Sequence, residues 1–346
     1  MNERLANEKI SKLLLSLAIP SILAQMVTLL YNLVDRIYIG RMEDGALAIA
    51  GIGLCSAIIT IIIAFTNLFG RGGAPLASIS LGADENDQAN KIISNCFSSL
   101  VLSSIVIMIV LYIFGEEILL LFGASANTLS YAKDYLNIYL LGTIFVQLSV
   151  GMNYFINCQG YAKFGMLTLV IGGALNIILD PIFIFTLNMG VAGAALATII
   201  SQFVSFLWVM HFIFSKRSTI KIKKEYLFFD KIIMKRVLGL GISPFFMNST
   251  EGILQVCFNR QLLFFGGDIA VSSMTIMASM AQIVFLPMVI KVALTFSVIM
   301  VTLMELFPAL FVSMFTNDLE VLIVMNLLLI KVGLLQKRIC YTISNL

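Results

Sequence analysis

The feature that most constrains this chain is a succession of long apolar runs along nearly its whole length. A helix of about 20 apolar residues crosses the hydrocarbon core of a bilayer. Only 12% of the residues are charged, about half the share found in soluble domains. We therefore expect an all-α polytopic membrane protein. The predicted spans are Leu13–Ile39, Ala46–Phe69, Ile92–Phe114, Tyr135–Cys158, Phe164–Leu187, Val191–Phe214, Val237–Phe265, Ile269–Ile290, Val292–Phe315 and the shorter Leu319–Leu335.

The distribution of basic residues predicts the orientation of these spans. With the N-terminus in the cytoplasm, seventeen basic residues lie inside, and only Arg41 and Lys133 lie outside. This asymmetry is what the positive-inside rule requires. We expect a multi-pass protein of the cell inner (plasma) membrane with a cytoplasmic N-terminus. Because basic loops serve orientation, the net charge of +3 does not indicate a nucleic-acid partner.

One long polar interval, Ser215–Arg236, divides the chain. It predicts a six-helix transmembrane lobe at residues 1–214, a basic cytoplasmic linker at 215–236, and a second lobe of three to four spans at 237–346. Pro20 and Asp35 correspond to Pro244 and Asn259 at an offset of 224. Parallel repeats of this kind are typical of transporters built from two halves.

A second correspondence has a different offset. Phe114–Ser125 matches Phe307–Asp318 at an offset of 193, so the second half has 31 fewer residues between the two matches. We expect an internal deletion and a truncated C-terminus; the alternative is a natural asymmetric bundle. A tight cytoplasmic turn at Pro287–Lys291 would then join the eighth and ninth predicted spans.

Two acids and two polar residues share one depth in the first lobe: Asp35, Asn176, Asp180 and Thr198. Counted from the outer turns at 1.5 Å per residue, they lie roughly 8–12 Å below the outer face. Burying an ionisable group in a membrane is costly, so such groups indicate a functional site. Pro181 cannot donate to the carbonyl of Ile177, which leaves one more oxygen free. The cluster suits Na⁺, or a proton shared between two acids.

Each of these residues also has a structural interpretation. Asp35 could pair with Arg36 or reach the outer surface, and Asn176 and Thr198 could be ordinary hydrogen-bonding residues between helices. Asp180 has no basic neighbour in its span. Glu251, inside the seventh span, is a second candidate acid.

The sequence gives little support for an enzymatic, phosphate-binding or transition-metal site. No serine, cysteine or histidine constellation indicates hydrolysis, and Gly70–Gly73 lacks the Lys-Ser/Thr of a phosphate loop. The five cysteines have no metal-like spacing. We expect no enzyme, no cofactor, and no metal beyond Na⁺ at the acidic cluster.

Five features together resemble the MATE (multidrug and toxin extrusion) family, in particular its bacterial Na⁺- or H⁺-coupled members. They are Pro20 with Asp35, the segment Gly70–Gly82, Asn157–Gly160, Asn176–Pro181 and Gly190–Thr198. The resemblance implies two six-helix lobes, alternating access, and export of amphipathic, mainly cationic drugs. The resemblance places a cation site at Asp35, Asn176, Asp180 and Thr198, the same residues that share one depth in the first lobe. It also adds Tyr135 as a candidate. The family's second glycine-rich segment and its last three spans have no counterpart here.

The predicted function is therefore a cation-coupled (H⁺ or Na⁺) antiporter of small amphipathic cations, acting as a monomer in the lipid bilayer and impaired by the truncation. One alternative is a lipid-linked glycan flippase of similar architecture, which would need several basic residues in its cavity. The first six spans offer only Arg36. The other alternative is a non-transporting remnant.

Overall fold

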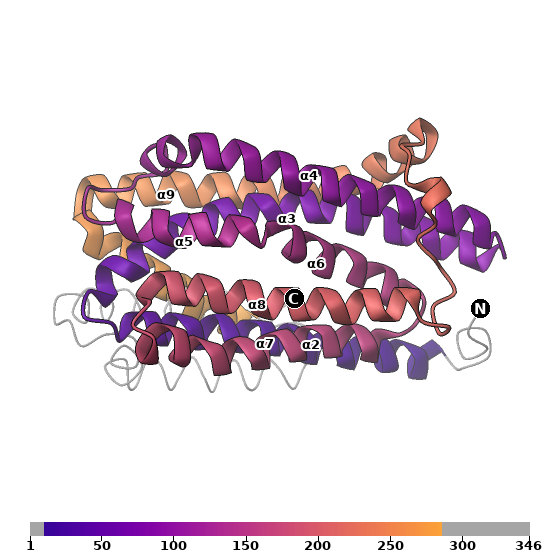
Figure 1. The fold of residues 1–346 in the computed structure, drawn as a ribbon, viewed down its shortest axis with the longest axis horizontal. Helices are drawn as coiled ribbons and strands as arrows, with labels where there is room; N and C mark the ends of the chain where they lie inside the picture. The colour runs from indigo at the N-terminus through magenta and orange to yellow at the C-terminus, as the bar shows by residue number, and fades with distance from the viewer. Residues whose placement is uncertain (1–9, 286–346) are drawn as a thin grey trace, which may run out of the picture.

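The computed structural model describes residues 10–285, and this part of the chain is helical, without strands. Long helices lie along one common direction and form an elongated bundle (Figure 1). The helices are α2 (Ile10–Gly40), α3 (Gly45–Gly82), α4 (Asn86–Leu121), α5 (Leu129–Leu141), α6 (Thr143–Cys158), α7 (Ala162–Pro181), the π-helical turn η1 (Ile182–Thr186), α8 (Gly190–Phe214), the 3₁₀ turn η2 (Lys224–Tyr226) and α9 (Lys231–Phe285).

The all-α membrane fold is confirmed. Six helices of the described part are long and apolar enough to cross a membrane, or seven if α5 and α6 count as one bent span. A bilayer permits this class because each helix satisfies its own backbone hydrogen bonds. The predicted spans beyond residue 290, the turn at Pro287–Lys291 and the match at Phe307–Asp318 lie outside the described residues.

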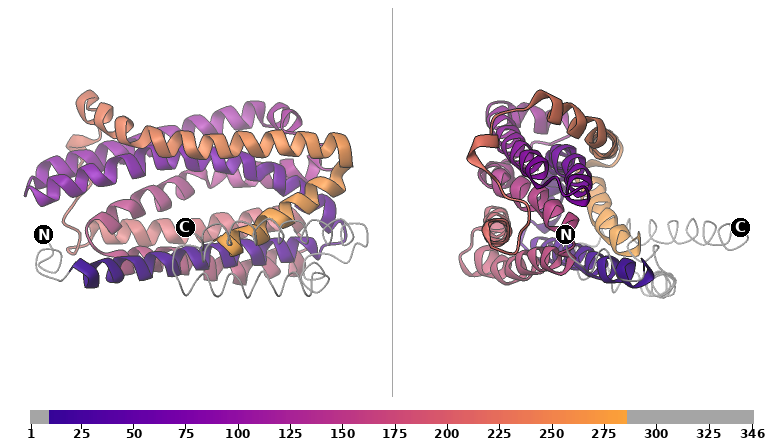
Figure 2. Two further views of the ribbon diagram at one scale, coloured as in Figure 1. Left: turned by 180° about the vertical axis from the view of Figure 1, so that it is seen from behind. Right: turned by 90° about the vertical axis from the view of Figure 1, so that its right-hand side faces the viewer.

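Helix α9 contains the predicted span Val237–Phe265 and the described part of the predicted span Ile269–Ile290. Its backbone breaks at Gly267, where φ is 63° and ψ is −163°. Residues other than glycine rarely adopt this backbone conformation. Figure 2 shows the chain turning back at this end of the bundle, so that the second part of α9 crosses the bundle in the opposite direction.

The predicted span Tyr135–Cys158 contains a break that the sequence analysis did not indicate. The helix breaks at Gly142, and α5 and α6 meet at a 58° bend. A Cβ atom on Gly142 would lie 2.5 Å from Cγ1 of Ile199 in α8. The break therefore coincides with a close contact between Gly142 and α8, which leaves no space for a side chain at this position.

The helices also extend beyond the predicted span bounds at Phe69 and Ile92. Helix α3 continues through the glycine-rich segment with Pro75 inside it, and only residues 83–85 separate it from α4. The glycines of this segment allow α3 to pack closely against neighbouring helices. A Cβ atom on Gly73 would lie 2.8 Å from Cζ of Phe155 in α6. Small residues let membrane helices approach in this way.

Two apolar clusters hold the helices together. One includes Ile52 of α3 and Leu136 of α5, and the other includes Phe155 of α6 and Phe212 of α8. Between these clusters the bundle contains polar residues, and these form the candidate site. The division of the chain at residues 214 and 236 remains a prediction.

Candidate functional site

The site begins with a hydrogen-bonded triad on α7 and α8. Asn176 and Asp180 lie one helical turn apart on α7, which places both side chains on the same face. The Asn176 amide Nδ2 donates to Asp180 Oδ1 over 3.1 Å and to Thr198 Oγ1 over 3.4 Å. The structure therefore brings three of the four predicted cation-site residues into direct contact.

This triad retains unused oxygens. Asp180 is 0% exposed and Asn176 is 2% exposed. Asp180 Oδ2 and Asn176 Oδ1 have no hydrogen-bond partner in the described part of the chain. Buried polar atoms are normally paired, and each exception needs an explanation. A bound cation, or a proton on the carboxylate, would satisfy these atoms.

Asp35 is placed beside the triad by the packing of α2 on α7. The two helices run in the same direction, because the chain reverses direction an even number of times between them. A Cβ atom on Gly173 would lie 3.1 Å from Cδ1 of Tyr31. Counting one turn onward in both helices brings Asp35 level with residue 177, between Asn176 and Asp180.

The alternative partner of Asp35 is engaged elsewhere. The Arg36 guanidinium donates to Ser56 Oγ over 2.7 Å, and no ion pair within residues 10–285 joins Arg36 to Asp35. Asp35 is 8% exposed, and its Oδ1 has no hydrogen-bond partner in this part of the chain. Asp35 is thus a second buried carboxylate with an unused oxygen.

These residues adjoin a cavity of about 670 Å³ inside the bundle. Asp35, Asn176 and Thr198 line it, whereas Asp180 lies outside its wall. The two weaker candidates also line it: Tyr135, which stacks on Tyr139 with ring centroids 5.9 Å apart, and Glu251 of α9. The cavity therefore unites residues that the sequence assigned to both halves.

Several polar residues of the cavity wall were not recognised as site residues in the sequence, among them Arg71, Asn153, Tyr154 and Asn157. Arg71 Nε donates to the Tyr154 hydroxyl over 3.0 Å, and this hydroxyl donates to Asn67 Oδ1 over 2.9 Å. Asn153 and Asn157 line the same region. A signal was present, because Asn67–Arg71 and Asn153–Asn157 are both i,i+4 polar pairs in apolar surroundings.

The donor atoms of the site are carboxylate, amide and hydroxyl oxygens. Such hard ligands suit Na⁺ better than a soft transition metal. In residues 10–285 no three His, Cys, Asp or Glu side chains group together as metal ligands.

Comparisons with known proteins agree with this architecture. The family model described as MatE matches residues 20–182. The multidrug export protein MepA of Staphylococcus haemolyticus (strain JCSC1435) is 31% identical over 258 residues, which is 74% of this chain. The chain covers 57% of that relative, so it spans less than two thirds of the curated protein's length.

Solved structures show the same fold. The structure of the MATE multidrug transporter DinF-BH, in complex with a small-molecule ligand, superimposes with a TM-score of 0.77 and 33% identity, covering 92% of this chain and 78% of the other. An inward-facing conformation of a multidrug resistance MATE family transporter of the MOP superfamily gives a TM-score of 0.80 at 23% identity, covering 92% and 79%.

Proposed function

The chain belongs to the MATE family of multidrug and toxin extrusion transporters, and we propose that it exports amphipathic, mainly cationic drugs in exchange for H⁺ or Na⁺. The observation that carries this proposal is the buried Asp180–Asn176–Thr198 triad, of which Asn176 and Thr198 line a large cavity. In the proposal the cation occupies the triad together with Asp35. The protein acts as a monomer in the cell inner (plasma) membrane, with its N-terminus in the cytoplasm.

Coupling follows from the position of the two acids. Each carboxylate is stabilised when it takes up a proton or contacts Na⁺, because it lies in a low-dielectric interior. Binding at Asp180 and Asp35 changes the packing of α7 against α2. If the cation and the drug prefer opposite conformations, exchange results from this difference in affinity.

The cavity has the chemistry for the proposed substrate. Its volume of about 670 Å³ lies within the range of small-molecule pockets. The rings of Tyr135 and Tyr139 offer apolar faces that attract cations. Asp35 and Glu251 supply negative charge on different helices. An amphipathic cation can therefore contact both an aromatic face and a carboxylate.

The flippase alternative gains one observation from the structure. Arg71 joins Arg36 on the cavity wall, so the cavity has two arginines where the sequence indicated one. The same wall carries the carboxylates of Asp35 and Glu251. A pyrophosphate group requires an excess of positive charge, and these four side chains are balanced. Export of cations is the better supported function.

Drug accumulation in a pump-deficient host tests the proposal. Cells expressing the wild-type chain should retain less of a lipophilic cationic dye than cells with Asp180→Asn or an empty vector. Glu116→Gln is the matched control, since Glu116 is an exposed acid that pairs with Lys133, and it should export like wild type. Equal accumulation in the wild type, Asp180→Asn and the empty vector would reject transport by this chain and favour the non-transporting remnant.

The cation site has a separate test in purified protein. We expect saturable Na⁺ binding, or proton uptake, that is lost in Asp35→Asn and in Asp180→Asn. Competition between Na⁺ and H⁺ for the same oxygens would appear as proton release when Na⁺ is added. Retention of the signal in the double variant would refute the assignment, whatever the outcome of the export assay.

A further inference from the structure

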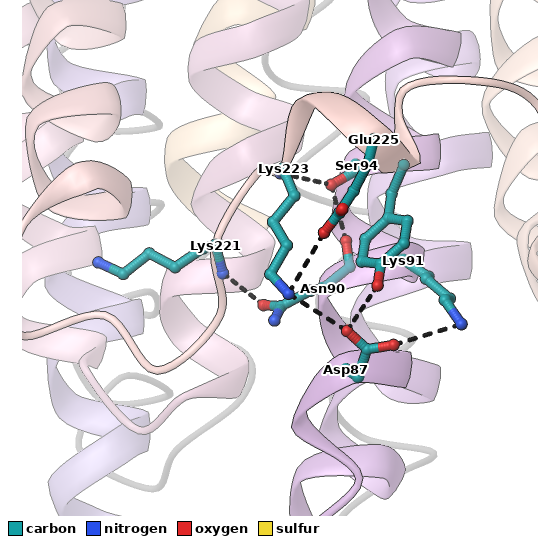
Figure 3. Close-up of polar contacts among 8 residues, drawn as sticks. Asp87, Asn90, Lys91, Ser94, Lys221, Lys223 and Glu225 are labelled. Atoms are coloured by element: carbon teal, nitrogen blue, oxygen red, sulfur yellow. Dashed lines mark hydrogen bonds and ion pairs between the residues drawn. The ribbon is translucent and has the colours of Figure 1, made fainter.

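Side chains in the first turns of α4 hold the linker between α8 and α9 in place. The backbone amide of Lys221 donates to Asn90 Oδ1 over 2.7 Å, and the amide of Lys223 donates to Ser94 Oγ over 3.1 Å (Figure 3). Asn90 and Ser94 lie one turn apart, so successive turns of α4 each bind the extended linker. The linker therefore has a defined inner side and a defined outer side.

Several charged side chains of the linker and of α4 pair with one another at the protein surface. Asp87 pairs with Lys91 and Lys223 at 3.3 Å each, and it accepts a hydrogen bond from the Tyr226 hydroxyl over 2.8 Å. Figure 3 shows the Lys91 and Lys223 side chains directed towards the Asp87 carboxylate. Lys223 also lies 3.6 Å from Glu225. Asp87, Lys91, Lys223 and Glu225 thus pair with one another, whereas Lys224, between Lys223 and Glu225 in the chain, is exposed.

The start of α9 is held in one rotation about its axis. The Asp230 carboxylate accepts hydrogen bonds from the amides of Ile232 and Ile233, over 2.8 and 3.3 Å, and so caps the helix. Ile233 is 3% exposed and Val237 is 0% exposed, both in the apolar cluster around α4. This buried stripe at i and i+4 fixes which side chains of the first turns point outward.

The outward side combines apolar and basic side chains. Phe228 is 83% exposed, Phe229 is 52% exposed and Ile232 is 69% exposed. Lys231, Lys235 and Arg236 are exposed beside them, and no carboxylate within the described residues pairs with these three cations. We define these six residues as the α9 entry surface.

The length of α9 places this surface at the edge of the bilayer. From Lys231 to the break at Gly267 the helix is about 54 Å long, which exceeds the ~30 Å hydrocarbon core. Lys231, Lys235 and Arg236 lie in the first two turns, and charged side chains are costly in hydrocarbon, so this end of the helix is the one that we place in the polar headgroup region. Apolar rings flanked by lysine and arginine are typical of segments that lie in this interface.

We propose that the α9 entry surface is a binding site for anionic phospholipid headgroups of the adjacent leaflet. The rings of Phe228 and Phe229 enter the boundary between headgroups and acyl chains, while the three cations contact the lipid phosphates. The hydrogen bonds to α4 orient the surface before a lipid binds. Each basic residue near an anionic membrane surface contributes about 1 kcal/mol, which corresponds to a preference of roughly five-fold per residue.

Quenching by brominated lipids tests the site in the intact membrane protein. Trp208 is the only tryptophan of the chain, so Trp208→Phe with Phe229→Trp provides a single reporter on the surface. This variant is reconstituted into phosphatidylcholine vesicles that contain brominated phosphatidylglycerol or brominated phosphatidylcholine. We expect both lipids to quench the reporter, with an apparent association constant at least about five-fold higher for phosphatidylglycerol.

Two further variants identify the cause of this preference. Lys231→Gln/Lys235→Gln/Arg236→Gln should abolish it. Lys216→Gln/Arg217→Gln, a matched pair of exposed basic residues in the same linker, should leave it unchanged. The site is refuted if the two lipids quench equally, if neither lipid quenches, or if the triple variant keeps its preference for phosphatidylglycerol.

Discussion

Helices α3 and α9 meet backbone to backbone at Gly241, and this contact gives the sharpest stability prediction. A Cβ atom on Gly241 would touch the carbonyl oxygen of Leu68 and lie 2.8 Å from its carbonyl carbon. Ordinary carbon–carbon contacts are about 3.5–4.0 Å. The Gly241→Ala substitution would thus push the two helices about 1 Å apart, which forfeits a quarter to a half of each contact energy there.

We expect Gly241→Ala to lower the free energy of unfolding by about 1–3 kcal/mol, the usual cost of overpacking. Gly239→Ala is the control in the same helix, since a Cβ atom there has no neighbour within 4 Å. Because alanine favours helix over glycine by up to about 1 kcal/mol, the control should be neutral or stabilised.

Thermal unfolding in detergent with a thiol-reactive dye provides the measurement. Cys55 and Cys96 are buried and react only on unfolding, whereas Cys257 is exposed. Serine replaces Cys257, the half-buried Cys158 and Cys340, which lies outside the described residues, in every variant. We expect a Tm several degrees lower for Gly241→Ala than for Gly239→Ala. Equal Tm values would show that α3 and α9 do not approach at Gly241 as described.

Three other changes test the site and the linker. Thr198→Val should reduce cation-driven dye efflux from proteoliposomes about ten-fold or more, because a hydrogen-bonding oxygen near a charged group is lost, whereas Thr198→Ser should retain it. Gln159 Oε1 accepts hydrogen bonds from Ser218 and from the amides of residues 219 and 220. Gln159→Leu should therefore lower the Tm in the dye assay, and Gln159→Glu, which keeps the acceptor, should lower it less. The hydrogen bond to Asp87 raises the pKa of Tyr226, so the contact stabilises the linker below pH ~10 and is lost as pH rises through the raised pKa. In Asp87→Asn the Tyr226 phenol should titrate closer to its usual value, measured as the difference between absorbance titrations with and without Tyr226→Phe; an unchanged titration would contradict the assigned contact.

The sequence alone determined the class of fold and singled out two acids that the structure buries. A bilayer requires apolar helices of sufficient length, so composition and run length indicated the spans directly. Burying a carboxylate in a membrane costs so much free energy that such a residue indicates a functional site. Asp180, with Asn176 one turn away, was recognised for that reason. Both signals depend on residues close together in the chain, where helical geometry is known in advance.

Tertiary structure decided where distant segments meet. The break at Gly142 coincides with the close approach of Ile199 of α8, and the course of the linker depends on Asn90, 131 residues before the amide that it binds. The position of Arg71 on the cavity wall likewise follows from α3 continuing past its apolar run. The sequence lists the polar residues of each helix, but the rotation and crossing of the helices select those that share a cavity. Close contacts between small residues and long-range hydrogen bonds make that selection. Neither kind of contact produces a periodic pattern in the sequence of a single helix, so the sequence does not predict it.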